Sequence, residues 1–141
     1  MLLGVVIVAS FLTGGCAVFG GGGCLGETSA FVDAVTADPF YVSAQIRFGA
    51  SENHQFSSCD SSEGIPGLDV RWPTVRPVES RPILEREALA AGWRARPDDG
   101  CWTKALAGQP AAFILDDPML VGTHVQFRPT AGAEPCGVYP D

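Results

Sequence analysis

Residues 101–128, CWTKALAGQPAAFILDDPMLVGTHVQFR, decide the fold that the sequence predicts. Three segments within it, 101–106, 111–115 and 124–128, are rich in strand-forming residues and are separated by turn residues such as Gly, Pro and Asp. The segment 111–115 is apolar throughout, which is typical of a strand covered on both sides. The stretch therefore predicts a three-stranded antiparallel meander with 111–115 at its centre.

Two further strands are expected upstream of the meander. Residues 41–48 alternate apolar and polar side chains, and this period of two predicts a strand with one buried face. Residues 69–75 show a similar alternation, but Pro73 cannot donate a ladder hydrogen bond and favours an edge strand or a bulge. Residues 49–68 are rich in Ser, Gly and Pro and predict a long loop between the two strands.

The best helix pattern runs from residue 81 to residue 91. Ser80 is a suitable N-cap, Pro82 suits a first turn, and Gly92 is a suitable residue to end the helix. Trp93 is then expected to cover the end of this helix.

A second, shorter helix is predicted over residues 28–36, with Ser29 as its N-cap and Asp38-Pro39 as its stop. The predicted fold class is α+β, with one main helix packed on a small antiparallel sheet and stabilised by disulfides. A mostly-β sandwich or an irregular barrel is the alternative.

The N-terminus has the features of an export signal. Residues 2–12 form an apolar run that is too short to cross a bilayer, which needs about 20 apolar residues. The small residues Gly14 and Gly15 then precede Cys16, as a signal peptidase site requires. These features predict cleavage immediately before Cys16.

The motif Leu12-Thr13-Gly14-Gly15-Cys16 resembles the lipobox of bacterial membrane lipoproteins. The resemblance implies a signal peptide over 1–15, a thioether diacylglycerol on Cys16 and an acylated amine at the new N-terminus. Residues 16–27, with four consecutive glycines, would be a lipidated tether, and 28–141 would be one small domain. Residues 90–93 and 101–104 are loosely similar to small lipoproteins of actinobacteria, which implies no activity.

The chain has five cysteines, an odd number for an exported protein. Acylation of Cys16 leaves Cys24, Cys59, Cys101 and Cys136, enough for two disulfides. Four cysteines allow three pairings, and the sequence does not choose firmly between them. We favour Cys24–Cys59 with Cys101–Cys136, each of which closes a loop of about 35 residues.

The charge of the chain excludes some partners. The formal net charge is −7, which argues against nucleic acid, since phosphate backbones are bound by basic surfaces. No cofactor motif or metal-ligand spacing is present in the sequence, so neither a cofactor nor a metal is expected. The expected membrane attachment is therefore the lipid on Cys16, on the extracytoplasmic face of the cell membrane.

The sequence suggests two functions from different classes. The first is a non-enzymatic, lipid-anchored envelope module that binds an unknown protein or small molecule or has a structural role. The alternative is a small secreted hydrolase that uses His54 or His124 with a nearby carboxylate. Trp72, Trp93 and Trp102 are expected in the core rather than in a ligand groove.

Overall fold

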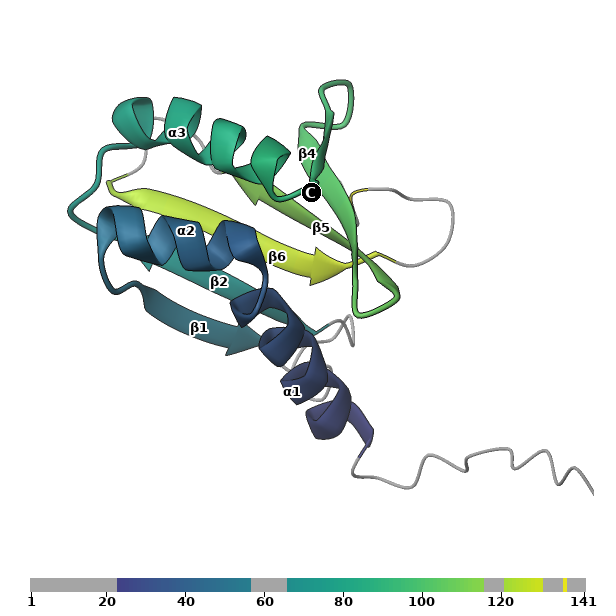
Figure 1. Ribbon diagram of the computed structural model, residues 1–141. Coiled ribbons are helices and arrows are strands. Elements are labelled where there is room, and N and C mark those ends of the chain that lie inside the picture. The colour runs from purple at the N-terminus through teal and green to yellow at the C-terminus, as the bar shows by residue number, and fades with distance from the viewer. Residues whose placement is uncertain (1–22, 57–65, 116–120, 131–135, 137–141) are drawn as a thin grey trace, which may run out of the picture.

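A six-stranded antiparallel sheet forms the centre of the computed structural model, and helices cover one of its faces (Figure 1). The structure describes residues 23–56, 66–115, 121–130 and 136. The helices are α1 (Gly23–Thr36), α2 (Pro39–Phe48) and α3 (Pro77–Ala90). The strands are β1 (Glu52–Phe56), β2 (Gly67–Trp72), β3 (Arg94–Arg96), β4 (Cys101–Leu106), β5 (Gln109–Leu115) and β6 (Thr123–Pro129).

The strand order is β1-β2-β6-β5-β4-β3, and every neighbouring pair is antiparallel. The predicted meander is confirmed as β4, β5 and β6, with β5 in the centre of the three. Strand β2 joins this meander by pairing with β6, so that Val70 lies opposite Val125. The short and largely polar strands β1 and β3 form the two edges, where charged and polar residues discourage pairing with other chains.

The fold class is α+β, as predicted, and the sheet is open, so neither the sandwich nor the barrel alternative describes it. The expectation of one main helix is wrong, because the described residues form three helices. Helices α2 and α3 lie side by side across one face of the sheet, whereas α1 runs past the end of the strands (Figure 1).

The strand predicted over 41–48 is wrong, because these residues form α2. Asp38 caps this helix by accepting a hydrogen bond from the backbone N of Phe40, and Pro39 occupies its first turn. Phe40 and Ala44, four residues apart, are buried against the sheet, whereas Ile46 is 82% exposed. The apolar alternation was therefore compatible with a helical face. Asp38-Pro39 starts α2, and it also follows the predicted end of the preceding helix at Thr36.

The predicted loop over 49–68 also needs correction, since it contains the edge strand β1. Its sequence, Glu-Asn-His-Gln-Phe, lacks apolar alternation because β1 pairs with β2 alone and is largely exposed. The strand expected at 69–75 is confirmed as β2, shifted toward the N-terminus. It is flanked by β1 and β6, and Pro73 lies just after it.

Two helix starts differ from the prediction. Helix α3 begins at Pro77, and Ser80 lies inside it, where its hydroxyl hydrogen-bonds to the hydroxyl of Thr123 on β6. Ser80 therefore joins a helix to the sheet instead of capping the helix. The predicted end at Gly92 is confirmed, with a left-handed φ of 85°. Helix α1 begins at Gly23, so that it includes residues 23–27 of the segment expected as a tether.

Aromatic side chains fill the space between the helices and the sheet. Phe40 of α2 stacks on Phe113 of β5 with 4.7 Å between ring centroids, and Trp93 meets the same ring edge-on at 4.8 Å. Phe127 completes the cluster from β6, and all four side chains are nearly fully buried. Such pairs add packing specificity to their large buried area. This cluster fixes the helix layer on the sheet and leaves a hollow beside α1.

Candidate functional site

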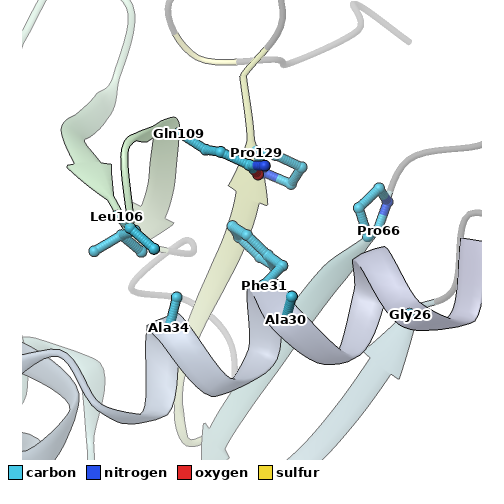
Figure 2. A pocket seen from close by; sticks show the side chains of 9 residues that line it. Gly26, Ala30, Phe31, Ala34, Pro66, Leu106, Gln109 and Pro129 are labelled. Atoms are coloured by element: carbon cyan, nitrogen blue, oxygen red, sulfur yellow. The ribbon is translucent and has the colours of Figure 1, made fainter. Parts of the chain in front are cut away.

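An apolar hollow of about 690 Å³ lies between α1 and the near end of the sheet (Figure 2). Its volume is in the range of small-molecule sites in proteins. The described residues that line it include one polar side chain, that of Gln109, and no charged one. They are Gly26, Ala30, Phe31, Ala34, Pro66, Leu106, Ala107, Gln109 and Pro129.

The sequence of α1 explains why this space stays open. Gly26, Ala30 and Ala34 recur every four residues, so that they share one face of the helix. Their small side chains leave a gap between the helix and the strand ends, where Phe31 projects toward Pro129 (Figure 2). This face of the helix is therefore an apolar wall of small side chains, and the end of the sheet opposite it is also apolar.

The opposite rim of the hollow contains a strained turn. Leu106, the last residue of β4, pairs with Gln109, the first residue of β5, which leaves a two-residue hairpin turn of Ala107 and Gly108. Both turn residues have positive φ, 48° at Ala107 and 81° at Gly108. A left-handed alanine costs free energy, and such strain is often found at functional sites. The rim is thus built from a backbone conformation that alanine disfavours.

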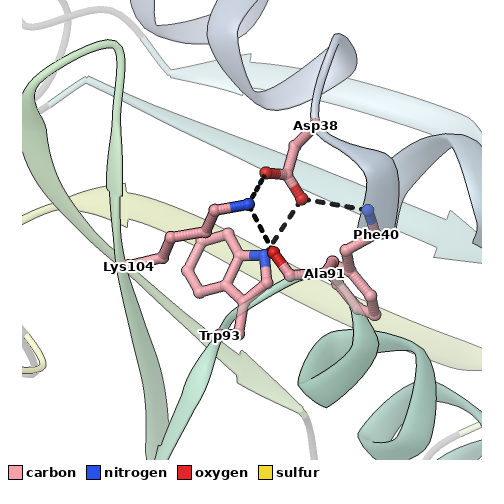
Figure 3. Close-up of polar contacts among 5 residues, drawn as sticks. All are labelled: Asp38, Phe40, Ala91, Trp93 and Lys104. Atoms are coloured by element: carbon pink, nitrogen blue, oxygen red, sulfur yellow. Dashed lines mark hydrogen bonds and ion pairs between the residues drawn. The ribbon is translucent and has the colours of Figure 1, made fainter.

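A buried polar network anchors the corner between α1 and α2 (Figure 3). The carboxylate of Asp38 accepts hydrogen bonds from the backbone N of Phe40, from Nε1 of Trp93 and from Nζ of Lys104. Lys104 Nζ also donates to the carbonyl of Ala91 at 2.6 Å and lies 5.9 Å from the Trp93 ring centroid. The Asp38 side chain is only 3% exposed, so its charge depends on these donors.

This network has a structural role that explains the chain's one lysine. It ties the start of α2, the end of α3 and strand β4 together at one carboxylate. A buried pair of this kind adds little net stability, but loss of one partner leaves an uncompensated charge. Lys104 is two residues before Leu106, so the network also holds β4 in place beside the apolar hollow.

The face of the sheet opposite the helices holds a second acid–base pair. Nε2 of His124 on β6 is 3.4 Å from Oδ2 of Asp69 on β2, and both side chains are less than one-fifth exposed. Burial raises the pKa of Asp69, but hydrogen bonds with His124 and Gln126 and the charges of His124 and Arg128 together outweigh it. The net effect lowers the pKa of Asp69 below its usual value.

The other predicted residues fall in different places. The exposed edge strand β1 carries His54, whose ring packs edge-on against Phe56 at 4.9 Å. Trp72 and Trp93 are buried in the core, as predicted, while Trp102 is half-buried and packs against it. Neither histidine lines the apolar hollow.

The disulfide expected between Cys101 and Cys136 is present, with a Cα separation of 5.9 Å, on the face of the sheet without helices. Cys59 lies outside the described residues, and Cys24 lies in α1 without a described side chain, so the other pair is untested. The signal peptide 1–15 and Cys16 also lie outside the described residues. Among the described residues, no helix has the length and apolarity to cross a bilayer, and no acidic, His or Cys cluster fits a metal.

Sequence reasoning missed two features of this site. The hollow depends on the small-residue repeat of α1, and its first member falls in the segment taken for a tether. Asp38 was assigned to a helix stop, although Asp before Pro is also a helix start. A test of both possibilities at Asp38-Pro39 could have found α2 and hence the polar network.

Comparisons of this chain with protein-family models, with curated proteins and with solved structures return no match. The function must therefore be argued from the described geometry and from the N-terminal motif.

Proposed function

We propose that this protein is an exported, lipid-anchored cell-envelope protein whose domain is a non-enzymatic module that binds an apolar ligand. The observation that carries the binding role is the hollow between α1 and the end of the sheet. Its described walls offer apolar and small side chains with one amide, a composition that suits an aliphatic chain or another apolar small molecule.

The position of the hollow agrees with this role. Helix α1 forms one wall and begins at Gly23, seven residues after Cys16. A short chain segment therefore separates the proposed acyl anchor from the proposed binding site. The domain would be held at the membrane surface, where apolar ligands are concentrated.

The experiment for binding is a titration with cis-parinaric acid, a fatty acid that fluoresces in apolar surroundings. The protein is the chain from residue 16 onward with Cys16→Ser, which retains every described residue. Ala30→Phe places a large side chain on the α1 face that lines the hollow. We expect affinity to fall about tenfold or more, since the added ring occupies the ligand's space.

The matched control for this substitution is Ala90→Phe, on an exposed position of α3. It adds the same ring away from the hollow and should leave the affinity within about twofold of the parent. Absence of saturable binding by the parent, or equal loss in both variants, would contradict the binding role.

The anchor has its own test. The intact mass of protein extracted from membranes should exceed the mass of residues 16–141 by the acyl groups, and Cys16→Ser should abolish this increase. An unmodified Cys16 in membrane-extracted protein would refute the lipid anchor without affecting the binding role.

One observation favours a second candidate, the secreted hydrolase. His124 lies beside Asp69, as the base and the orienting acid of a hydrolytic site do. The pair does not line the apolar hollow, which is why the binding role is preferred. Hydrolysis of p-nitrophenyl acetate that is lost in His124→Gln but kept in His54→Gln would reverse this preference.

A further inference from the structure

A second, open hollow of about 640 Å³ lies at the β3 edge of the sheet, and its described lining is basic. Arg94, Arg96 and Lys104 line it together with the hydroxyl-bearing Thr103 and Thr130. No Asp or Glu is among the described lining residues, although acids outnumber bases by 16 to 9 in the chain. Three of the chain's nine Lys and Arg residues thus line one hollow in an acidic protein.

The strand geometry places the two arginines on one face. Arg94 and Arg96 are two residues apart on β3, so their side chains leave the same side of the strand about 7 Å apart. Arg94 pairs across the ladder with Thr103, and Thr103 pairs with Ala112, which pairs in turn with Arg128. The neighbouring Trp93 and Trp102 face the helix side, so this row belongs to the face without helices.

The charges in the hollow differ in how far they are already neutralised. Lys104 already gives its ammonium to Asp38 and the Ala91 carbonyl, so it is not counted among the donors available to a ligand. Arg96 is bonded to Asp99 in an exposed ion pair at 2.9 Å, a type that is weak in water. Arg94 forms no ion pair with any described residue, and the half-buried hydroxyl of Thr103 has no described hydrogen-bond partner.

We propose that this hollow binds a phosphate group of a small ligand or of a lipid headgroup. Two guanidinium groups beside a hydroxyl supply the paired donors that phosphate oxygens accept, and each guanidinium can bind two oxygens at once. The net charge of −7 repels large polyanions, so the selected ligand is small and held locally. This site is separate from the apolar hollow and does not depend on the lipid anchor.

The test is calorimetric titration of the full chain in a non-ionic detergent at low ionic strength. The probes are glycerol 3-phosphate, a monoester, and glycerophosphoglycerol, the diester of a phospholipid headgroup, with glycerol as the neutral control. We expect saturable binding of one or both phosphates and no binding of glycerol. The phosphate probe that binds more tightly identifies the ligand class. Tighter binding of glycerol 3-phosphate indicates a soluble monoester, and tighter binding of glycerophosphoglycerol indicates a lipid headgroup. Failure of both phosphates to bind at millimolar concentration would overturn the proposal.

Variants locate the binding. The double variant Arg94→Gln with Arg96→Gln should lower the affinity for the more tightly bound phosphate probe by about tenfold or more. Arg76→Gln with Arg86→Gln removes the same charge from the N-cap and the interior of α3 and should change binding less than about twofold. Equal losses in the two double variants would show a general charge effect and refute the site.

Arg94→Lys keeps the positive charge on the edge strand β3 but removes the planar guanidinium group, which can bind two phosphate oxygens at once. It should weaken binding about threefold and leave the melting temperature unchanged. If the glutamine variants aggregate because the edge strand has lost its charges, the phosphate affinity of Arg94→Lys still tests the site. Unchanged phosphate affinity in Arg94→Lys and in a soluble Arg94→Gln would contradict recognition by this side chain.

Discussion

The two faces of the sheet each hold one carboxylate paired with a base, and the two pairs differ in what surrounds them. On the helix side, Asp38 receives donors from α2, from Trp93 and from Lys104 of β4. On the other face, Asp69 meets His124 and Gln126, which both lie on the adjacent strand β6. The first pair therefore connects elements that are far apart in the chain. The second pair lies on two strands that backbone hydrogen bonds already hold together.

This difference predicts a difference in stability. Asp38→Ala should lower the free energy of unfolding by about 3–5 kcal/mol, because the buried Trp93 indole N–H loses its acceptor and the Lys104 ammonium keeps only the Ala91 carbonyl. Urea denaturation followed by fluorescence measures the effect. Asp33→Ala, at an exposed position of α1, is the control and should cost less than about 0.5 kcal/mol. A loss below 1 kcal/mol in Asp38→Ala would end the contrast between the two faces.

One donor of the network can be removed by itself. Trp93→Phe keeps an aromatic ring in the core but deletes the N–H that bonds Asp38 at 3.0 Å. We expect a loss of about 2 kcal/mol, since the bond is made to a charged acceptor and the smaller ring packs less fully. Trp102→Phe, which loses the same atoms at a half-buried site, should cost about half as much. Equal costs would show that ring volume, not the hydrogen bond, matters at Trp93.

The pair on the other face should act through pH. The pKa of Asp69 is lower in the folded protein than in the unfolded chain, so its stabilisation is present above the unfolded value near 3.9 and lost as pH falls through the folded value. Asp69→Asn should therefore flatten the decline of stability between about pH 5 and pH 2. At neutral pH we expect a cost of about 0.5–1 kcal/mol, reduced by solvent screening.

Denaturation midpoints across this pH window provide the measurement, with Asp98→Asn as the control for loss of a carboxylate at an exposed turn. An acid decline as steep in Asp69→Asn as in the parent would mean that other carboxylates carry the acid sensitivity.

The smallest expected effect concerns the rim of the apolar hollow. Ala107 has a φ of 48°, which asparagine tolerates better than alanine in a two-residue hairpin turn. Ala107→Asn should raise the free energy of unfolding by about 0.5–1 kcal/mol. Its thermal midpoint should rise while the parinaric acid affinity stays within twofold. A lower midpoint would show that the rim is not strained.

The sequence predicted the meander well because residues 111–115 of β5 are continuously apolar and the flanking segments contain Gly and Pro. The sequence-based prediction failed at α2. Apolar residues at every second position fit one face of a strand and, taken four residues apart, also fit one face of a helix. Tertiary burial chose Phe40 and Ala44 for the core and left Val42 and Ile46 exposed. It also failed at β1, since an exposed edge strand needs no apolar pattern.

The candidate site was less accessible to sequence reasoning than the fold. The apolar hollow brings together α1, the β4–β5 turn and the end of β6, which are more than 70 residues apart in the chain at their extremes. No local sequence pattern predicts that these three segments lie next to one another. The small-residue repeat of α1 was the visible signal, and its first member, Gly26, fell in the segment expected to be a flexible tether.

The most direct test of the binding role is chemical-shift mapping of the labelled chain from residue 16 onward, carrying Cys16→Ser, during titration with lauric acid. We expect saturable shifts concentrated at residues 26–34, 106–109 and 129, with Asp69 and His124 little changed. Shifts centred on the face without helices, or no saturable shifts at all, would contradict an apolar ligand site beside α1.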